Sequence, residues 1–185
     1  RPKLGCPDRI VFDFDPDDGL QWGQVVEAVG LMKTLLEEIG LEGYLKTTGG
    51  KGLHIVVPIK PARGWDEIKG FSKAVAEFLC RTFPDRFTDK ITKSRRRGKI
   101  FIDYLRNAEG STAIAAYAVR GRENAPVATP IAWSELRHEV RFDHFNVRNV
   151  PARLERMKSD PWKGFFEARQ TVTAAMMKKV GYPSR

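Results

Sequence analysis

The chain has 185 residues, 42% hydrophobic and 30% charged, which is sufficient for one globular domain with its own core. Two cysteines are too few for a disulfide scaffold, and no stretch approaches the roughly 20 apolar residues of a membrane span, so no membrane partner is expected. The net charge of +9 favours a polyanionic partner, because cations that neutralise phosphates release counterions.

The first half of the chain predicts alternating strands and helices. Apolar residues at Val25, Val29 and Leu36 fall on one helical stripe, and Gly40 is a plausible end for that helix. Proline and Asp-Gly pairs mark the turns. The predicted elements are a strand at 9–14, a turn at 15–19, a helix at 22–39, a strand at 44–47, a glycine-rich loop at 48–52, a strand at 53–59 and a helix at 65–83.

The second half is less regular, since prolines interrupt it from about residue 121 onward. Its predicted elements are a polar, basic connection at 84–98, strands at 99–105 and 112–120, a short helix near 133–137 and a terminal helix over about 161–179. Helices and adjacent β segments together favour an α/β or α+β fold, in which a mixed sheet is flanked by helices.

Two carboxylates, Asp13 and Asp15, stand at the end of the first predicted strand. Because side chains alternate along a strand, both leave from one face, while Phe12 and Phe14 leave from the other. Like charges repel unless a cation lies between them, and hard divalent cations prefer such oxygen ligands. The pair therefore indicates a metal site, although a simple turn before Pro16 is the alternative.

The glycine-rich loop from Thr48 to His54 has the composition of a phosphate site. The glycines, including Gly50, let backbone N–H groups approach a phosphate, and Thr48, Lys51 and His54 add donors. A strand rather than a helix follows, so this is not a Walker A loop. A glycine-rich hairpin with an exposed lysine is the alternative interpretation.

A third carboxylate, Asp103, interrupts an apolar strand, where an unpaired charge is costly to bury. Either it serves a site or it pairs with a nearby arginine such as Arg106. Arg106 and Arg120 can hold a triphosphate through paired hydrogen bonds, or are surface charges. Together the carboxylates, the loop and the arginines are what a two-metal phosphoryl-transfer site requires.

Three motifs give the chain a resemblance to a known family. They are Asp-Phe-Asp-Pro from Asp13, Lys-Thr-Thr-Gly-Gly-Lys-Gly-Leu-His from Lys46, and Lys-Ile-Phe-Ile-Asp-Tyr-Leu-Arg-Asn from Lys99. In this order and spacing they resemble the polymerase domain of bacterial DNA ligase D, of the archaeo-eukaryotic primase superfamily. The similarity extends over roughly residues 5–140, including Ala-Ala-Tyr-Ala-Val-Arg from Ala115.

The resemblance implies a role for each of these residues. Asp13, Asp15 and Asp103 would be catalytic and hold two Mn²⁺ or Mg²⁺ ions. The incoming NTP or dNTP would be bound by Thr48, Gly50, Lys51, His54, Arg106 and Arg120. The implied activity is template-dependent addition of nucleotides to DNA 3′ ends during non-homologous end joining. The implied partners are DNA ends with a 5′-phosphate, Ku and a ligase domain, in the bacterial cytoplasm at the nucleoid.

The family comparison also sets expectations for domain organisation. Residues 1–185 would form a single primase-polymerase catalytic domain, with 140–185 a helical C-terminal extension. Because the chain opens at Arg1 and family members carry an upstream part, an N-terminal truncation is expected. That upstream part supplies the family's 5′-phosphate pocket and a base-stacking aromatic. The family usually has serine where Thr48 stands, which keeps the hydroxyl but adds a methyl group.

A run of cations precedes the strand of Asp103. Lys93, Arg95, Arg96 and Arg97 either form a solvated loop or contact DNA phosphates beside the metal strand, and we expect the DNA contact. Two other functions remain open at this point. One is a catalytically weak DNA-end binding module, and the other is a metal-dependent nuclease, since nucleases also cluster carboxylates.

Overall fold

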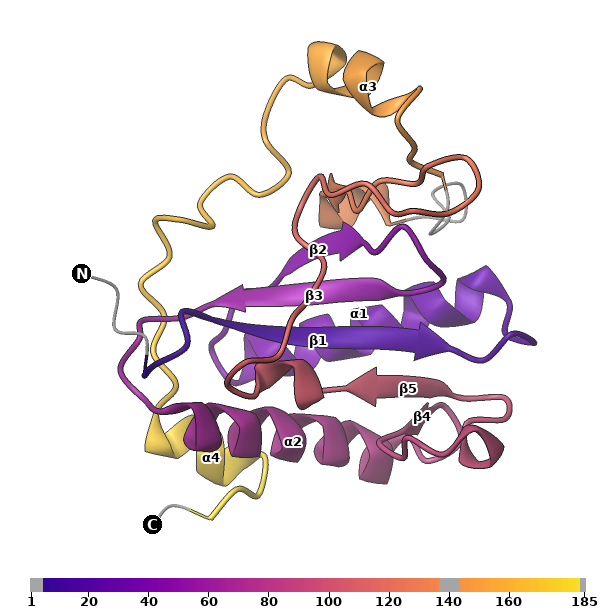
Figure 1. The fold of residues 1–185 in the computed structure, drawn as a ribbon. Helices are drawn as coiled ribbons and strands as arrows, with labels where there is room; N and C mark the ends of the chain where they lie inside the picture. Colours follow the sequence, from indigo (N-terminus) through magenta and orange to yellow (C-terminus); the bar gives the residue numbers. More distant parts are fainter. Residues whose placement is uncertain (1–4, 137–143, 184–185) are drawn as a thin grey trace.

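A mixed six-stranded β-sheet organises the chain, in the order β4-β5-β1-β3-β2-β6 (Figure 1). The computed structural model describes residues 5–136 and 144–183. Every pairing of named strands is antiparallel except that of β4 with β5. The strands are β1 (Arg9–Pro16), β2 (Tyr44–Thr47), β3 (Leu53–Pro58), β4 (Phe87–Thr88), β5 (Ile100–Asp103) and β6 (Pro130–Ile131). The fold is therefore α+β, as the sequence predicts.

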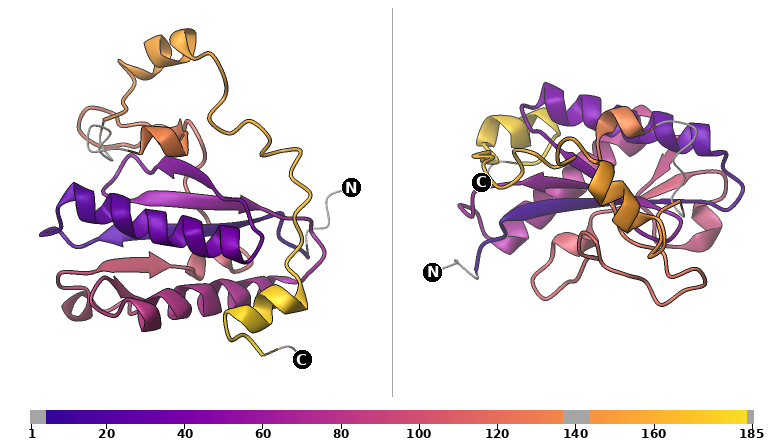
Figure 2. Two further views of the ribbon diagram at one scale, coloured as in Figure 1. Left: turned by 180° about the vertical axis from the view of Figure 1, so that it is seen from behind. Right: turned by 90° about the horizontal axis from the view of Figure 1, so that it is seen from above.

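Two long helices, α1 (Trp22–Glu38) and α2 (Trp65–Thr82), pack with one face of the sheet (Figures 1 and 2). Phe12 and Phe14 of β1 point to this side and are fully buried, together with Leu53 and Ile55 of β3. This is the period-2 alternation expected of a strand with one buried face. The remaining helical elements are α3 (Val150–Arg156), α4 (Ala174–Lys179), and short 3₁₀ turns η1 (Lys93–Arg95), η2 (Leu105–Asn107) and η3 (Trp133–Glu135).

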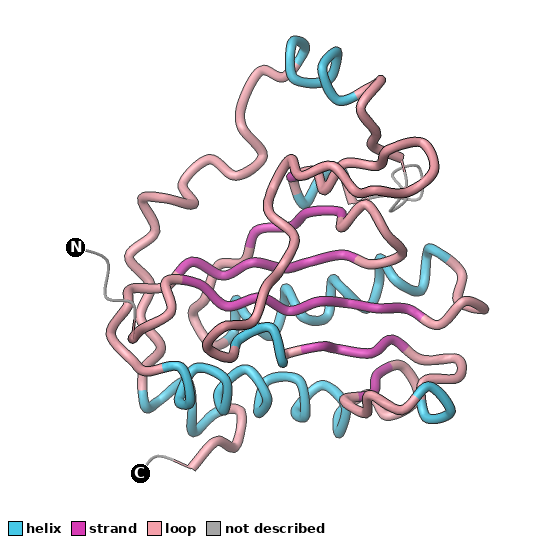
Figure 3. The backbone as a smooth tube through the Cα atoms, viewed as in Figure 1, coloured by secondary structure: helices cyan, strands magenta, loops and turns pink. Residues whose placement is uncertain are grey.

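The other face of the sheet carries the polar side chains of β1. In the described parts of the chain, the long segment 108–129 rather than a long helix crosses in front of β1 and β3 on this face (Figure 3). A separate small apolar cluster lies at one end of this open face, formed by Val11, Tyr44, Val56 and Phe165. The helices thus bury one face for stability and leave the other available for a site.

The strand predicted over 112–120 is wrong. This stretch is irregular and bonds to 126–128 through single contacts, such as Tyr117 N–H to the carbonyl of Ala128 at 2.6 Å. Tyr117 has φ of 60°, which no β-strand accommodates, and Val119 makes just an isolated bridge with Val127. The segment therefore lies over the sheet rather than in it.

The helix predicted over 161–179 is also wrong, since helical structure there is limited to α4. Gly164, with φ of 92°, interrupts it, and the Gln170 side chain ties an extended segment to Glu42 and Pro58. Helix α3 and strands β4 and β6 have no counterpart among the predicted elements. Residue 140, where the C-terminal extension was expected to begin, lies outside the described residues.

Two predicted boundaries differ from the structure for local reasons. The strand expected over 99–105 ends at Asp103, because Tyr104 turns into a 3₁₀ geometry with ψ of −6°. The helix expected near 133–137 is the 3₁₀ turn η3, and Arg137 lies outside the described residues. No helix in 5–136 or 144–183 has the length and apolarity needed to cross a membrane.

A buried side chain replaces β5 where that strand ends. Asn107 accepts from the Val11 N–H at 2.7 Å and donates to the Val11 carbonyl at 2.8 Å, so its amide imitates the next residue of a paired strand. It also donates to the Tyr104 carbonyl at 2.9 Å, and it is 2% exposed. Without it, the backbone of β1 directly upstream of Asp13 would be buried without these partners.

We expect Asn107→Ala to lower the free energy of unfolding by about 2–4 kcal/mol, because two buried backbone groups lose their partners. Urea unfolding followed by far-UV circular dichroism measures the change. Glu109→Ala, at an exposed position two residues along, is the control and should change stability little. Equal stabilities of the two variants would show that the Asn107 bridge contributes nothing.

Candidate active site

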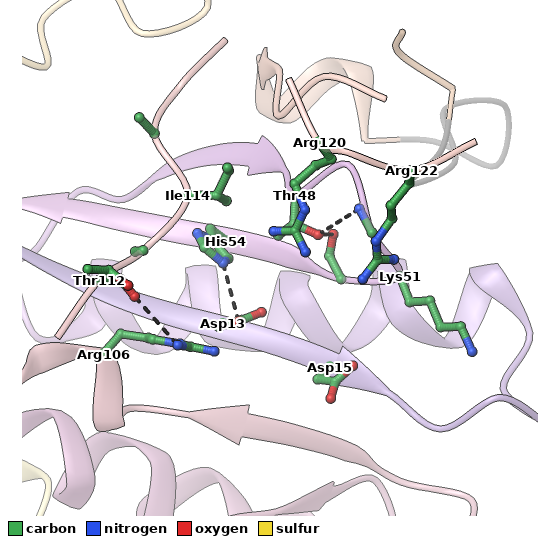
Figure 4. A pocket seen from close by; sticks show the side chains of 14 residues that line it. Asp13, Asp15, Thr48, Lys51, His54, Arg106, Thr112, Ile114, Arg120 and Arg122 are labelled. Atoms are coloured by element: carbon green, nitrogen blue, oxygen red, sulfur yellow. Dashed lines mark hydrogen bonds and ion pairs between the residues drawn. The ribbon is translucent and has the colours of Figure 1, made fainter. Parts of the chain in front are cut away.

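A row of four polar residues crosses four strands on the open face. In the antiparallel registers, Lys46 of β2 lies opposite His54 of β3, His54 opposite Asp13 of β1, and Asp13 opposite Asp103 of β5. Residues directly opposite in such ladders project from the same face, with neighbouring side chains in reach. His54 Nε2 lies 3.3 Å from Asp13 Oδ2 (Figure 4). Sheet register therefore joins residues that are up to 90 positions apart in sequence.

Asp15 lies one step further along β1 on the same face and is half-exposed. Its carboxylate is 3.0 Å from the guanidinium of Arg96, whose Cζ lies 3.9 Å from the centroid of the Phe101 ring. Partial burial, followed by the negative charge of Asp13, raises the pKa of Asp15, while Arg96 opposes this shift. Asp15 thus experiences the like-charge crowding that the sequence predicts for the carboxylate pair.

Asp103 is the last residue of β5, and the residues that directly follow this strand bind its carboxylate. One carboxylate oxygen accepts from the Leu105 N–H at 2.7 Å, and the other lies 3.3 Å from Arg106 Nε. Arg106 also donates to the Thr112 carbonyl at 3.5 Å, which links β5 to the crossing segment. The alternative considered for Asp103, an ion pair with Arg106, is therefore present, alongside its position opposite Asp13.

The glycine loop owes part of its composition to close packing. A Cβ on Gly52 would lie 2.4 Å from the Phe14 carbonyl oxygen, and Gly49 has φ of 64°. The Thr48 hydroxyl donates to the Gly52 carbonyl at 3.0 Å and accepts from the Gly50 N–H at 3.2 Å. These glycines hold the loop against the end of β1, beside Asp13 and Asp15.

A cavity of about 670 Å³ lies between the sheet, the glycine loop and the crossing segment (Figure 4). Every sequence-predicted metal or nucleotide ligand lines it except Asp103, which lies beside it in register with Asp13. Lys51 points away to an ion pair with Asp18 at the exposed turn. The lining residues are Asp13, Asp15, Thr48, Gly50, Lys51, Gly52, His54, Arg106, Thr112, Ala113, Ile114, Ala115, Arg120 and Arg122.

Sequence reasoning missed Arg122, which lines the cavity beside Arg120. Its guanidinium lies 3.4 Å from the position that a Cβ on Gly50 would take, so the glycine admits this close approach. The sequence did carry a signal for it, because Arg122 follows Arg120 after a single glycine. The predicted strand ended at Arg120, so Arg122 was not considered. With Arg106, three arginines face the cavity.

The donor chemistry of the three aspartates suits a hard divalent cation. Partial burial raises the pKa of Asp15 most, and the negative charge of Asp13, which a cation would offset, raises it further. In the side-chain positions observed, however, no group of three or more His, Cys, Asp or Glu among the described residues is arranged to hold a metal ion. Asp15 turns to Arg96 and Asp103 to Arg106. Metal binding would have to exchange these arginines for the ion.

The basic segment divides into two kinds of residue. Lys93, Arg95 and Arg97 are exposed around η1, as a phosphate-contacting surface requires. The Arg96 side chain is 18% exposed and is held between Phe101 and Asp15. Arg96 therefore belongs to the carboxylate site rather than to the outer surface.

Lys46 is a second site residue that the sequence did not predict. It begins one of the three family motifs, but no role was assigned to it. It is 2% exposed, and its Nζ has no hydrogen-bond partner among the described residues. Burial lowers the pKa of Lys46 to about 8, and the charge of Asp13 only partly opposes this. Burial likewise lowers the pKa of His54. A buried, unpaired ammonium next to the carboxylate row is costly unless a ligand uses it.

Comparisons with known proteins find similar sequences over most of the chain. The family model described as LigD, primase-polymerase domain, matches residues 1–162. The multifunctional non-homologous end joining protein LigD of Pseudomonas aeruginosa is 44% identical over 180 residues, which cover 97% of this chain and 21% of that protein. The bifunctional LigD of Bacillus subtilis is 33% identical over 155 residues, covering 83% and 25% respectively. The chain thus spans about a quarter or less of these curated relatives.

A solved structure has the same fold. The polymerase domain from Mycobacterium tuberculosis ligase D, in complex with DNA, superimposes with a TM-score of 0.82 at 33% identity. The match covers 90% of this chain and 57% of that one.

We expect Lys46→Met to stabilise the protein at pH 7 by on the order of 2–3 kcal/mol, because it removes a buried charge. Between pH 8 and 10.5 the unfolded wild-type chain binds more protons than the folded one, so wild-type stability rises through that window. The advantage of the variant should therefore shrink with pH.

Urea unfolding of both proteins at pH 7, 8, 9 and 10 measures this difference. Lys60→Met, at an exposed lysine, is the matched control and should show no such trend. An advantage for Lys46→Met that stays constant from pH 7 to 10 would contradict a buried, charged amine.

Proposed function

The chain belongs to the LigD primase-polymerase domain family, and from its open-face site we propose that it is a template-dependent nucleotidyltransferase that adds nucleotides to DNA 3′ ends. The observation that carries the proposal is the register that sets Asp13 opposite Asp103, with Asp15 on the same face beside an arginine-rich cavity. Carboxylates beside arginines suit a reaction that needs cations and binds polyphosphate.

Each part of the site has a role in this proposal. Asp13, Asp15 and Asp103 would hold two Mn²⁺ or Mg²⁺ ions, which when bound supply positive charge that polarises a phosphoryl group and acidifies a hydroxyl. Asp103, at the end of the row, would also help to accept the proton of the primer 3′-hydroxyl. Arg96 and Arg106 would release the carboxylates when the ions bind, since each pair is only partly buried.

The phosphates of the incoming nucleotide would occupy the 670 Å³ cavity. Arg106, Arg120 and Arg122 present planar guanidinium groups to it, which bind phosphate oxygens in pairs. The glycine loop would add the Gly50 backbone and the Lys51 ammonium, after Lys51 leaves Asp18.

The partners are proposed from the same relatives. The M. tuberculosis neighbour is in complex with DNA, and the relatives are end-joining proteins, so DNA ends with a 5′-phosphate are the proposed substrate. Ku and a ligase domain are the proposed protein partners, and the bacterial cytoplasm at the nucleoid is the proposed location.

Primer extension on gapped DNA with a downstream 5′-phosphate tests the activity, with Mn²⁺ or Mg²⁺ and either ribo- or deoxyribonucleotides. We expect template-directed extension that falls by at least about a thousandfold in Asp13→Asn, because the ion-binding charge is lost. Asp85→Asn, at an exposed aspartate after α2, is the control and should extend normally.

Other results would select the competing functions. DNA binding without extension would identify a DNA-end binding module. The physical reason would be that Arg96 and Arg106 keep Asp15 and Asp103 from binding metal ions. Shortening of the primer would identify a metal-dependent nuclease. Extension that ignores the template base would refute template dependence alone.

The basic segment yields a separate prediction about DNA affinity. We expect Arg95→Ala combined with Arg97→Ala to weaken DNA binding and to reduce the slope of log K against log salt by about 2, since two phosphate contacts are lost. Arg81→Ala combined with Arg86→Ala, at other exposed arginines, should leave the slope nearly unchanged. Fluorescence anisotropy at several salt concentrations measures both slopes, and equal slopes in all three proteins would exclude the segment as a DNA contact.

A further inference from the structure

Helix α3 stands apart from the sheet, at the end of a long excursion of the chain (Figures 1 and 2). Of its seven residues, all of which the structure describes, Val150 alone is buried. A helix this short is marginal by itself, and burial of one valine contributes only about 1.5–3 kcal/mol. Core packing therefore does not explain why the chain holds this helix out from its body.

Arg153 holds α3 in a defined place. Its guanidinium pairs with both carboxylate oxygens of Glu135 in η3, with Nη2 lying 2.9 Å from Oε2. Nη2 also donates to the Pro130 carbonyl of β6 at 3.3 Å, and the Arg153 Cζ lies 4.9 Å from the centroid of the Phe145 ring. An arginine paired through two bonds fixes orientation as well as charge. The helix is thus attached to the β6 edge of the sheet.

The outward surface around α3 is cationic. Arg148, Arg156 and Lys158 are exposed, and none of them forms an ion pair with a residue in 5–136 or 144–183. Glu155 is the single carboxylate in the sequence from 148 to 158. We call Arg148, Arg156 and Lys158 the α3 surface. Its anchor, Arg153, already has a partner, whereas these three cations are free to bind an anion.

A short backbone ladder joins the α3 surface to the 670 Å³ cavity. Residues 145–147 bond to residues 125–127 of the crossing segment, through N–H donors at 2.9 and 3.2 Å from their acceptors. Just before this ladder the crossing segment carries Arg120 and Arg122 into the cavity, and directly after it comes Arg148. Cations therefore continue from the cavity to α3 along one connected unit.

The α3 surface and the basic segment at η1 lie at opposite edges of the sheet. The strand order is β4-β5-β1-β3-β2-β6; the chain passes through η1 between β4 and β5, whereas α3 is attached to β6. The carboxylates of β1 and the cavity lie between the two edges (Figure 1). A small anion can use one of these surfaces, but a polyanion that crosses the sheet can use both.

A nucleic acid fits the α3 surface better than an anionic membrane does. A helix that lies on a membrane buries a broad apolar face in the lipid. Within α3, Leu154 is the one large apolar side chain that is exposed, and the helix has only seven residues. Regularly spaced backbone phosphates instead need separate cations, and each phosphate that a cation neutralises releases counterions.

We propose that the α3 surface binds backbone phosphates of DNA where the strand leaves the cavity on the β6 side of the sheet. This inference rests on the proposed function, which takes DNA as the substrate. Contacts to phosphates carry no sequence information, so the surface positions the DNA without selecting bases. It acts at the edge opposite the basic segment and does not depend on that segment.

Fluorescence anisotropy with the gapped DNA at several salt concentrations tests the α3 surface. The variant combines Arg148→Ala, Arg156→Ala and Lys158→Ala and keeps the anchor Arg153. We expect it to bind DNA at least about tenfold more weakly and to reduce the slope of log K against log salt by about 2–3, since each lost phosphate contact removes about one.

The matched control combines Lys60→Ala, Arg81→Ala and Lys178→Ala. These three cations are exposed in the loop after β3, in α2 and in α4, so the control has the same change in net charge. It should keep nearly the wild-type slope. Equal reductions of the slope in both variants would make the effect one of net charge and overturn the α3 surface.

Binding of inorganic tripolyphosphate with Mg²⁺, measured by isothermal titration calorimetry, separates the α3 surface from the cavity. The α3 variant should bind it within about twofold of the wild-type chain, because none of the three side chains lines the cavity. Equal weakening of DNA and tripolyphosphate would make these cations part of the nucleotide site and overturn the proposal.

Vesicles of phosphatidylcholine and phosphatidylserine in equal parts test the membrane as the partner. Vesicle binding that the α3 variant loses, with its DNA affinity and salt slope unchanged, would assign the surface to lipid and reject the proposal. If the wild-type chain does not bind the gapped DNA, the proposed function and this inference both fail. If it binds and the α3 variant keeps its slope, the α3 surface alone is rejected.

Discussion

The register between β1 and its two neighbours, β3 and β5, is the constraint on which the site depends. Pairing Asp13 with both His54 and Asp103 places a basic ring, a carboxylate and a second carboxylate side by side on one face. A shift of one residue would turn Asp13 towards the helices and both Phe12 and Phe14 towards the open face, so the burial of these phenylalanines fixes the site as well as the core. Asn107 also helps to fix β1, because its side-chain amide hydrogen-bonds to the backbone of Val11, beyond the end of β5.

The same architecture separates stability from chemistry. Helices α1 and α2 bury one face of the sheet, whereas the segment 108–129 and the small apolar cluster around Phe165 lie over the open face (Figures 1 and 2). The crossing segment supplies Arg120 and Arg122 over the glycine loop and is anchored by Arg106 to β5. Irregular backbone is useful here, since it can present arginines at an angle that a seventh strand would not permit.

Electrostatic balance on the open face depends on exchangeable partners. Arg96 and Arg106 neutralise two of the aspartates through half-exposed ion pairs, which hold little free energy and can be replaced. Lys46 and His54 differ, because both are buried and burial lowers the pKa of each. The outer carboxylates therefore have partners that can be replaced, whereas Lys46 Nζ and His54 Nδ1 in the inner row have no hydrogen-bond partner among the described residues.

The sequence by itself determined the parts of the site that follow from local pattern. Alternation along β1 set Asp13 and Asp15 opposite the buried phenylalanines, and the loop from Thr48 to His54 was identified by its composition and its following strand. The first two strands, both long helices and the α+β class follow from the same periodicities. The family resemblance, carried by three motifs, is confirmed over residues 1–162.

Only the tertiary structure decided which of these residues meet. Local pattern cannot give cross-strand register, so the row through Lys46 and the inward turn of Arg96 were not visible beforehand. The positive φ of Tyr117 and the tie of Gln170 to Pro58 are set by long-range packing, which overrides local propensity and removed a predicted strand and most of a predicted helix. Propensity describes what a segment can adopt alone, whereas a site is made from contacts between segments distant in sequence.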